Sequence, residues 1–409
     1  MRFLPVPGRT MPADGGGLVL VLNAGSSSLK FAGFAAMPEG PEPRFGGQVE
    51  GIGAAPHLVA RNAAGEVLAD HRWDGGDAPA NHAEALGVIV RGLDQALQGE
   101  AILAIGHRVV HGGTDFAAPL RIDDAAMAAL DRLVPLAPLH QPHNLVGIRA
   151  AAAHFPGVPQ VACFDTAFHR TQSWAAETYA LPPRFYDQGI RRYGFHGLSY
   201  EYISRRIAAE DAALGAGRLV VAHLGNGASL CAIEGGRSRA STMGFTALDG
   251  IPMGTRSGQI DPGVVLHMID ALGMTTAEVT RLLYNGSGLK GLSGVSQDVR
   301  QIEAAGTEAA GRALEHFAFR VRREIGAMAA SIGGIDALVF TAGIGENAHG
   351  LRARICAGLE FLGITLDPAR NAANAAEISA AGAAVRVLVR RTDEEGMIAR
   401  HTLDLLRAG

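Results

Sequence analysis

The hydrophobic and polar positions at the start of the chain predict a β-hairpin. Residues 18–34 read LVLVLNAGSSSLKFAGF, with an apolar run on either side of a small polar turn. Such runs around a cluster of small residues are typical of two strands joined by a tight turn. The backbone N–H groups of the turn can converge on an anion, and its hydroxyls and Lys30 add donors and positive charge. The first hairpin is therefore a candidate phosphate-binding element.

The same pattern returns in the second half of the chain. An apolar run at 219–224 is followed by a small polar turn at 225–229, GNGAS, and by a second apolar run at 230–233. The long separation excludes a short-period repeat and indicates two related domains instead. Each domain would begin with a hairpin that can hold phosphate.

Strand and helix patterns alternate along the rest of the chain, which predicts an α/β fold with helices covering the sheets. The helical patterns cover 78–97, 123–133, 142–154, 199–209, 262–272 and 311–332, and the strand patterns cover 102–110, 158–164, 337–341 and 385–389. A last helix is expected to start at Thr392, because Thr392 and Glu395 have the spacing of a capping box. That spacing gives Glu395 a structural role and leaves Glu394 beside it without one.

Composition narrows the class of protein. The 409 residues are enough for two domains, and 48% hydrophobic with 19% charged residues is typical of a soluble globular chain. A formal net charge of −4 provides no basic field, so we expect no nucleic-acid partner. No apolar run reaches the length of a membrane span, so no membrane partner is expected either.

The cysteines and the N-terminal segment bear on location. Cys163, Cys231 and Cys356 have no C-x-x-C spacing, which argues against a disulfide framework or a structural zinc site and fits a reducing cytoplasm. Residues 1–17 are rich in Pro and Gly and have the pattern of neither a signal peptide nor a membrane helix. We expect them to be a disordered extension of a cytoplasmic protein.

The segment GHRVVHGG at 106–113 offers the first candidate chemistry. The valines between His107 and His111 indicate a strand, where four residues span about 13 Å, so one metal ion cannot be held by both imidazoles. Arg108 lies at a strand end beside a glycine turn, where a guanidinium can hold a carboxylate in a bidentate pair. A surface ion pair is the alternative interpretation of Arg108.

Three further polar residues stand where α/β proteins bind ligands. Asp165 directly follows a strand, where it can orient water, a metal ion or an arginine, or else cap a helix. His196 lies between two glycines, so its imidazole can approach a transferring phosphoryl group, unless it is a structural histidine. Arg256 is flanked by small residues, so its guanidinium can reach into a cleft and clamp a phosphoryl group.

A glycine-rich segment, GIGENA at 343–348, follows the strand predicted at 337–341. It nearly matches a dinucleotide fingerprint, but no strand ending in Asp or Glu follows at the required distance. Contact with the adenosine or α-phosphate of a nucleotide fits the other phosphate-binding turns better. The chain also lacks a Walker motif, since GSGLK at 286–290 has the wrong spacing. A kinase outside the P-loop class is indicated.

Taken together, these motifs resemble those of the acetate kinase family, in order and from about residue 18 to the end. The turn NAGSSSLK at 23–30 is similar to the family's first signature, and YGFHG at 193–197 and MGTRSG at 253–258 are similar to its second. The resemblance implies the fold of the acetate and sugar kinase, heat-shock chaperone and actin superfamily. That fold has two ribonuclease-H-like (actin-like ATPase) domains with an ATP cleft between them, here residues 18–165 plus 391–409, and residues 166–390.

Carried over position by position, the resemblance implies a role for each candidate. The catalytic residues would be Asp165, His196 and Arg256. The substrate would contact Arg108, Val110, Leu139, His140, Phe195 and Ala247. ATP or ADP would contact Lys30, His223, Leu224, Gly225, Asn226, Gly227, Asp298, Val299, Arg300, Gly343, Ile344, Gly345, Glu346 and Asn347. Mg²⁺ or Mn²⁺ would be held by Asn23 and Glu394, whose oxygens suit such a cation.

The implied reaction is a reversible phosphoryl transfer from ATP to acetate, which gives acetyl phosphate and ADP, in a homodimer. Ala247 departs from the family, which usually has a proline there lining the acyl pocket. One or two methylenes discriminate by only about 1–3 kcal/mol each, so propionate or another short-chain acid is the alternative substrate, although Val110 favours a small acyl group. A non-catalytic, actin-like ATP-binding module is a second alternative, against which the complete catalytic set argues.

Overall fold

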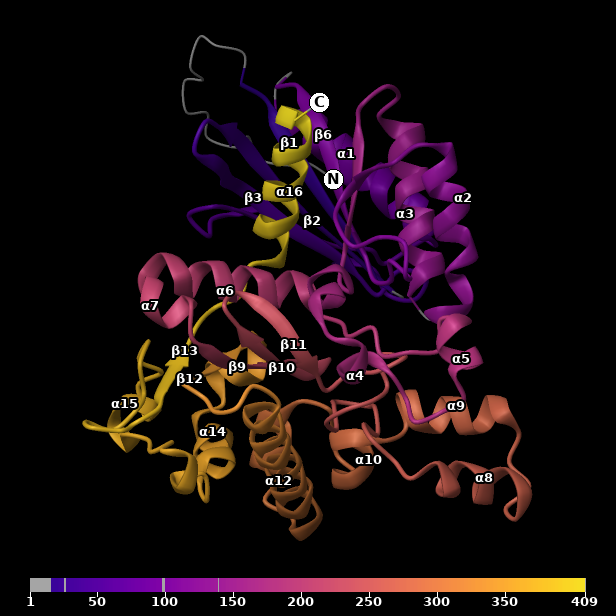
Figure 1. Cartoon of the computed structure of the whole chain (residues 1–409). Helices are drawn as coiled ribbons and strands as arrows, with labels where there is room; N and C mark the ends of the chain where they lie inside the picture. The colour runs from indigo at the N-terminus through magenta and orange to yellow at the C-terminus, as the bar shows by residue number, and fades with distance from the viewer. Residues whose placement is uncertain (1–15, 26, 98–99, 139, 409) are drawn as a thin grey trace. The chain divides into compact units, whose positions relative to one another are not determined.

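Figure 1 shows the chain as a computed structural model, in which residues 16–25, 27–97, 100–138 and 140–408 are described. The chain forms two compact units. The first comprises the residues up to Ala167 and those from Asp393 onward, and the second comprises Phe168–Thr392. Most of the expected extension at 1–17, and the expected substrate residue Leu139, lie outside the described residues.

An eight-stranded sheet forms the centre of the first unit, in the order β5-β4-β3-β2-β1-β6-β8-β7. β1 is antiparallel to β2 and parallel to β6, and β6 is parallel to β8. Asn23 lies opposite Lys30 in the first hairpin, which confirms the expected strand–turn–strand unit. The strands are β1 (Leu18–Ala24), β2 (Ser28–Met37), β3 (Gly40–Glu50), β4 (His57–Asn62), β5 (Val67–Arg72), β6 (Ile102–Val109), β7 (Leu120–Arg121) and β8 (Gln160–Phe164).

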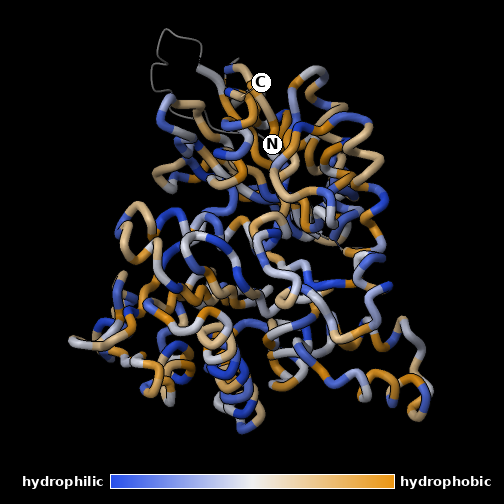
Figure 2. The backbone as a smooth tube through the Cα atoms, viewed as in Figure 1, coloured by the Kyte–Doolittle hydropathy of each residue, from blue (hydrophilic) through white to orange (hydrophobic). Residues whose placement is uncertain are grey.

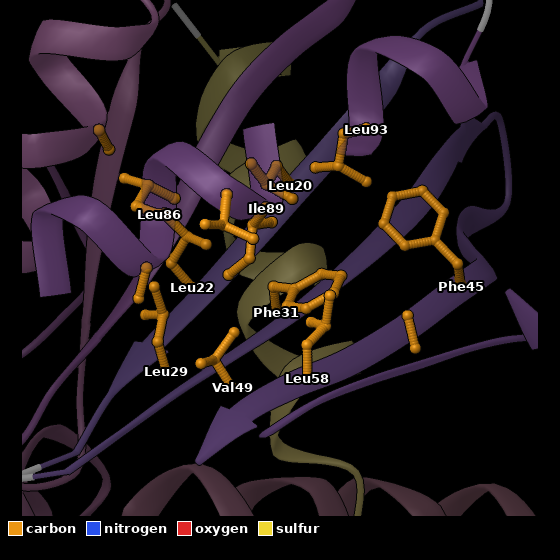
Figure 3. Packing of buried hydrophobic residues seen from close by; sticks show 14 of the residues in the cluster. Leu20, Leu22, Leu29, Phe31, Phe45, Val49, Leu58, Leu86, Ile89 and Leu93 are labelled. Atoms are coloured by element: carbon orange, nitrogen blue, oxygen red, sulfur yellow. The ribbon is translucent and has the colours of Figure 1, made fainter. Parts of the chain in front are cut away.

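Helices cover both faces of this sheet. On one face, Leu86 and Ile89 of α1 pack against Leu20, Leu22 and Phe31 of the strands (Figure 3). On the other face, α16 approaches β6 so closely that a Cβ at Gly106 would lie 2.6 Å from Ile398. Burial of these apolar side chains, worth roughly 25 cal/mol per Å², fixes the helices on the sheet. The helices are α1 (His82–Leu97), α2 (Asp124–Arg132), the 3₁₀ turn η1 (Val134–Leu136), α3 (Gln141–His154) and α16 (Glu394–Ala408).

A five-stranded sheet forms the centre of the second unit, in the order β11-β10-β9-β12-β13. β9 is antiparallel to β10 and parallel to β12, and β12 is parallel to β13. Tyr200, Ile203 and Ile207 of α6 pack on one face of this sheet, and α12 packs on the other. The strands are β9 (Arg218–Leu224), β10 (Ala228–Glu234), β11 (Arg237–Ser241), β12 (Ala337–Thr341) and β13 (Arg386–Val389).

The two sheets share one strand order at their centres. The strands β3-β2-β1-β6-β8 of the first unit and β11-β10-β9-β12-β13 of the second each place an antiparallel meander beside two parallel strands. This five-stranded order is that of a ribonuclease-H-like domain. The expected α/β fold with two related domains, each containing one of the hairpins, is therefore confirmed.

Apart from α6 and α12, the helices of the second unit are short. Within the described residues, no helix is both long enough and apolar enough to cross a lipid bilayer. The helices are η2 (Ala167–Thr171, which begins in the first unit), α4 (Trp174–Glu177), α5 (Pro183–Asp187), α6 (Gly197–Glu210), α7 (Ala212–Gly215), α8 (Pro262–Asp270), α9 (Thr276–Asn285), α10 (Gly288–Ser293), α11 (Val299–Ala305), α12 (Glu308–Ser331), α13 (Ala342–Asn347), α14 (His349–Cys356), η3 (Glu360–Leu362) and α15 (Pro368–Ala372).

The start of the last helix differs from the expectation. Asp393, not Thr392, caps α16, because its Oδ1 accepts a hydrogen bond from the Gly396 N–H at 2.8 Å. The Thr392 hydroxyl lies 2.8 Å from the Ser199 hydroxyl, and its N–H donates to Glu346. The capping box of Thr392 and Glu395 is therefore wrong: a polar partner distant in sequence takes the Thr392 side chain, and the neighbouring aspartate is the stronger cap.

His107 gives the first unit a predicted sensitivity to acid. Its side chain is buried on β6, with Nε2 2.6 Å from the Gln160 side-chain amide. Burial lowers the pKa of His107 to about 4, from an ordinary value of 6.5. Between these two pH values the unfolded chain binds a proton that the folded chain does not, so the free energy of unfolding falls as the pH falls from 6.5 to 4.

We expect the parent protein to lose stability in acid more steeply than a His107→Gln variant. The difference in slope is at most about 1.4 kcal/mol per pH unit, measured by denaturant unfolding between pH 7 and pH 4.5. His71→Gln, on the edge strand β5, controls for the loss of a histidine. Parallel pH curves for the parent and His107→Gln would contradict the expectation.

Candidate active site

An arginine–aspartate pair lies at the carboxyl ends of two neighbouring parallel strands of the first unit. Arg108 is the penultimate residue of β6, and Asp165 directly follows β8. Arg108 Nε lies 3.0 Å from Asp165 Oδ1, and Arg108 Nη2 lies 2.6 Å from Asp165 Oδ2. Asp165 is 1% exposed. The sequence left open whether Arg108 forms a bidentate pair with a carboxylate or a surface ion pair. The structure shows a bidentate pair of Arg108 with the buried Asp165.

Two more carboxylates and a lysine act on this pair electrostatically. Burial alone would lower the pKa of Arg108, but the charges of Asp165, Glu394 and Glu395 outweigh it and raise the pKa. Burial raises the pKa of Glu394 to about 7, with Asp165 and Glu395 adding to the effect, while Arg108 and Lys30 oppose it. Lys30 acts on Glu394, and it lies opposite Asn23 in the first hairpin. The first hairpin and the start of α16 therefore lie close together.

The residues expected to hold a divalent cation fit that task. Glu394 Oε1 is buried and has no hydrogen-bond partner among the described residues, although burying an unpaired carboxylate oxygen is costly. Asn23, at the end of β1, adds an amide oxygen. No group of three or more His, Cys, Asp or Glu side chains suited to a metal is found in the described part of the chain. One carboxylate and one amide suit Mg²⁺, which takes its other ligands from water and phosphate.

A buried asparagine that the sequence did not single out ties two parts of this site together. Asn144 of α3 donates from Nδ2 to the Ala24 carbonyl at 2.8 Å, and its Oδ1 accepts from the Val110 N–H at 3.0 Å. The end of β1 and the expected substrate residue Val110 are thereby fixed to one helix. The expected residue His140 precedes that helix as its N-cap. Because α3 also carries Gln141, His143 and Arg149, no signal in the sequence distinguishes Asn144.

The second unit places His196 and its glycine-rich hairpin side by side. His196 precedes α6 with φ +59°, a left-handed conformation that is uncommon for a residue with a side chain. Its ring stacks on that of His223, at the end of β9, with centroids 4.3 Å apart. The preceding residue, Phe195, is buried, and its carbonyl lies 2.9 Å from His169 Nε2. This strained backbone holds His196 against the turn at 225–227.

Arg256 points toward the same turn. A Cβ built on Gly227 would lie 3.1 Å from His196 Nε2 and 3.9 Å from Arg256 Nη1, so a side chain at this position would crowd the His196 ring and contact Arg256. Arg256 Nη1 donates to the Ala247 carbonyl at 3.0 Å, which links the arginine to the position that departs from the family. Two positively charged or hydrogen-bonding groups thus converge on the second hairpin.

The three segments expected to bind nucleotide line one cavity of about 590 Å³ in the second unit. They approach it from the β9–β10 turn, from the start of α11 and from the start of α13. Asp298 caps α11 by accepting from the Arg300 N–H, and Arg300 Nη2 lies 2.6 Å from Asp298 Oδ2. The expected residues on the wall are Gly225, Asn226, Asp298, Val299, Arg300, Gly343, Ile344 and Asn347.

Other residues complete this cavity or lie apart from it. Gln297, Glu303, His349 and Gly350 also line it and were not predicted, because they belong to no motif. The expected residues Leu224, Gly345 and Glu346 lie within the same segments but not on the wall. The Gly345 carbonyl accepts a hydrogen bond from the buried Arg352 at 2.8 Å, which fixes the backbone of α13.

A larger hollow, of about 930 Å³, lies elsewhere in the second unit. Its wall includes Arg192, Asp249 and Arg323, and the first two form an ion pair at 3.0 Å. None of the expected nucleotide residues lines it. We assign the nucleotide to the smaller cavity, because backbone N–H groups of glycine turns and helix starts bind phosphate.

Comparison with known proteins agrees with this geometry. The sequence model of the acetokinase family matches residues 18–400. An acetate kinase of Methylocella silvestris is 53% identical over 95% of this chain and 98% of its own length. The crystal structure of Porphyromonas gingivalis acetate kinase has a TM-score of 0.85 at 39% identity, covering 95% of this chain and 100% of its own. A propionate kinase structure from Francisella tularensis has a TM-score of 0.87 at 36% identity, covering 95% and 99%.

Fold and site together define a kinase of the actin-like two-domain ATPase class. Two ribonuclease-H-like units and a cavity lined by glycine-rich turns are the features of that class seen here. More narrowly, the chain belongs to the acetokinase family. The family expected from the motifs is therefore confirmed.

Glu394→Gln tests whether Glu394 is a cation site. Because its raised pKa means that the ionised form costs stability as the pH rises from 4.5 to 7, the neutral variant should be at least as stable as the parent at pH 8 without Mg²⁺. MgADP should then stabilise the parent more than the variant. Denaturant unfolding with and without MgADP measures both effects, with Glu395→Gln as the control. Equal stabilisation of parent and variant would remove Glu394 from the site.

Proposed function

We propose that the chain catalyses the reversible, Mg²⁺-dependent transfer of the γ-phosphoryl group of ATP to acetate, which gives acetyl phosphate and ADP. The observation that carries the proposal is the pair of Arg108 and Asp165 beside Glu394, in a member of the acetokinase family. A carboxylate acceptor needs an arginine held in a fixed direction and needs no strong base, since it is already ionised at pH 7. Positioning and charge neutralisation then supply most of the catalysis.

In the first unit, we assign acetate to Arg108. Asp165 takes Nε and Nη2 of the guanidinium, so Nη1 is the group that we assign to the acetate carboxylate. Asp165 would fix the direction of Arg108 and keep its charge in place. Val110 and His140 would form part of the wall around the methyl group. When bound, Mg²⁺ would neutralise charge on the phosphate oxygens, and Asn23 and Glu394 would hold it, with Lys30 as a supporting contact.

In the second unit, we assign the phosphoryl group to His196 and Arg256. Both converge on Gly227, in a turn whose backbone can hold phosphate. They would stabilise the charge on the equatorial oxygens as the carboxylate attacks in line, Arg256 by its positive charge and His196 by a hydrogen bond. The cavity of about 590 Å³ would take the adenosine and α-phosphate. The direct attack that we propose leaves no covalent phosphoryl-enzyme.

A second candidate substrate is propionate. Ala247 is a small residue where a proline is usual in the family, and a propionate kinase is among the similar solved structures. A smaller side chain can widen an acyl pocket by about one methylene, which changes selectivity by only about 1–3 kcal/mol. Acetate remains the preferred assignment, because the Methylocella acetate kinase, at 53% identity, is more similar to this chain than the Francisella propionate kinase, at 36%.

We further propose a homodimer in the cytoplasm. Helix α8 is strongly apolar and has no buried residue, and Leu266 on it is 59% exposed. The α8 segment is largely orange in Figure 2. The family resemblance implies a homodimer, and we propose that α8 belongs to its interface. The three cysteines are buried free thiols, which suits a reducing compartment. Sedimentation of the parent and of Leu266→Glu tests the dimer: a monomeric parent would overturn it.

Trapping of the acyl phosphate with hydroxylamine tests the function. With MgATP, the purified chain should form acetyl hydroxamate from acetate, and the relative kcat/KM for acetate, propionate and butyrate identifies the preferred acid. ATP binding without any hydroxamate would favour the non-catalytic module. A higher kcat/KM for propionate would favour the second candidate.

Arg256→Ala should lower kcat by about 10³-fold or more, because it removes a charge that acts on the transition state. The fold should be retained, because Arg256 is partly exposed and its hydrogen bond to the Ala247 carbonyl joins two loop residues. Arg312→Ala, an exposed arginine on α12, is the matched control and should leave kcat unchanged. Near-parent kcat in Arg256→Ala would remove this residue from the mechanism.

A further inference from the structure

Two serines in the second unit hold the two stacked histidines from opposite directions. His196 Nδ1 lies 2.8 Å from the Ser229 hydroxyl of β10, and His223 Nδ1 lies 2.8 Å from the Ser199 hydroxyl of α6. The histidine that precedes α6 is thus held by a serine of the sheet, and the histidine of the sheet is held by a serine of α6. Both serines are fully buried. The proposed function uses the histidines and leaves the serines unexplained.

The fold explains why these groups meet. His196, Ser199 and Tyr200 precede or open α6 at spacings of three and four residues, which place them on one helix face. His223 and Ser229 are direct partners in the antiparallel ladder of β9 and β10, so their side chains leave the sheet on the same face. Helix face and strand pair therefore meet as two complementary surfaces.

Tyr200 extends the contact of His196 into a chain of three groups. The Tyr200 hydroxyl lies 2.5 Å from the Ser229 hydroxyl, which in turn lies 2.8 Å from His196 Nδ1. Tyr200 is fully buried, so this hydroxyl is held in a single environment. A phenol is a far better proton donor than an aliphatic alcohol, so it donates to Ser229 rather than accepting from it. Ser229 then has its own proton to donate to His196 Nδ1.

We propose that Tyr200 and Ser229 are positioning residues that keep His196 in the neutral form with its proton on Nε2. This inference rests on the proposed function, in which His196 donates to the transferring phosphoryl group. Since Nδ1 accepts the Ser229 proton, the ring proton is confined to Nε2. That nitrogen is the one beside Gly227, 3.1 Å from where its Cβ would be. The hydrogen bond from Ser229 thus fixes both the tautomer and the orientation of the His196 ring.

The positioning is needed because His196 alone is not constrained to this state. The two neutral tautomers of an imidazole differ little in energy, and the partner of one nitrogen decides where the proton resides. Without Ser229, the ring can present an acceptor instead of a donor to a phosphate oxygen, which would repel it. A wrong tautomer in an otherwise intact site lowers kcat and leaves substrate binding largely unchanged.

A double-mutant cycle tests whether the serine acts through His196. Ser229→Ala should lower kcat by about tenfold or more in the parent background, with KM for MgATP changed less than about threefold. In a His196→Ala background, the same substitution should change kcat by less than about twofold, because there is no imidazole left to position. An equal loss of kcat in both backgrounds would overturn the proposal, since it would show a general structural effect.

Tyr200→Phe removes one hydroxyl and keeps the packing of the ring. It should lower kcat in the same direction as Ser229→Ala but less, and the two losses should not multiply in the double variant. Ser379→Ala is the matched control: Ser379 is a buried serine of the second unit whose hydroxyl lies 2.9 Å from a Glu377 carboxylate oxygen, in a pair that we do not assign to the reaction. Losses of equal size in Ser379→Ala and Ser229→Ala would also contradict the proposal.

A readout independent of activity separates this inference from the function itself. In protein with ¹⁵N-labelled histidine, the resonances lost in His196→Gln identify His196, and long-range ¹H–¹⁵N spectra show which nitrogen is protonated. We expect the Nε2–H tautomer in the parent and a mixture in Ser229→Ala. A parent in the Nδ1–H form would overturn the positioning role even if the chain makes acetyl phosphate. The expected tautomer in a chain without activity would overturn only the proposed function.

Discussion

The site of the first unit depends on the buried ion pair of Arg108 and Asp165. Asp165 is almost fully removed from water, and burying a carboxylate is costly unless a positive charge with matching geometry lies beside it. The parallel pairing of β6 and β8 supplies that geometry, since it brings the carboxyl ends of both strands to the same edge. Removing Arg108 would leave Asp165 as an uncompensated buried charge, which costs about 3–5 kcal/mol.

The charge balance around this pair explains the other features of the unit. Glu394 and Glu395 add negative charge at the start of α16, while Lys30 adds a positive charge from the first hairpin. An excess of carboxylate that is poorly solvated costs stability in the protein alone and favours a bound cation. The glycine at 106 allows α16 to approach β6, and so brings these carboxylates to the pair. The carboxylates at this site thus lower the stability of the protein alone, and a bound cation can restore it.

The second unit relies on backbone geometry and neutral hydrogen bonds rather than on a buried ion pair. His196 adopts a left-handed conformation before α6, and buried hydroxyls hold its ring. In the turn at 225–227, the glycine at 227 leaves space that both His196 and Arg256 approach. Such an arrangement costs about 1–3 kcal/mol in strain, which the packing of α6 on the sheet must offset.

The elements of this fold were readable from the sequence to different degrees. Both hairpins, the strand at 337–341 and the helix expected at 262–272 follow from local patterns, and the structure has all of them. The glycine-rich segments at 225–229 and 343–348 were singled out by their motifs, and the segment at 298–300 only by the family resemblance. That all three line one cavity required the strand order. Asn144, Ser229 and Tyr200 were missed, because a single buried polar residue has no pattern until its partner, far along the chain, is known. The cap of α16 was misassigned for the same reason.

The central claim is that Asp165 acts on acetate through Arg108, and steady-state kinetics of Asp165→Asn test it most directly. The amide keeps the shape but cannot accept both guanidinium hydrogen bonds as a charged partner. We predict that kcat/KM for acetate falls by about 10²-fold or more while KM for MgATP changes less than about threefold, in a variant that still binds ADP. Parent-like acetate kinetics in Asp165→Asn would contradict the account.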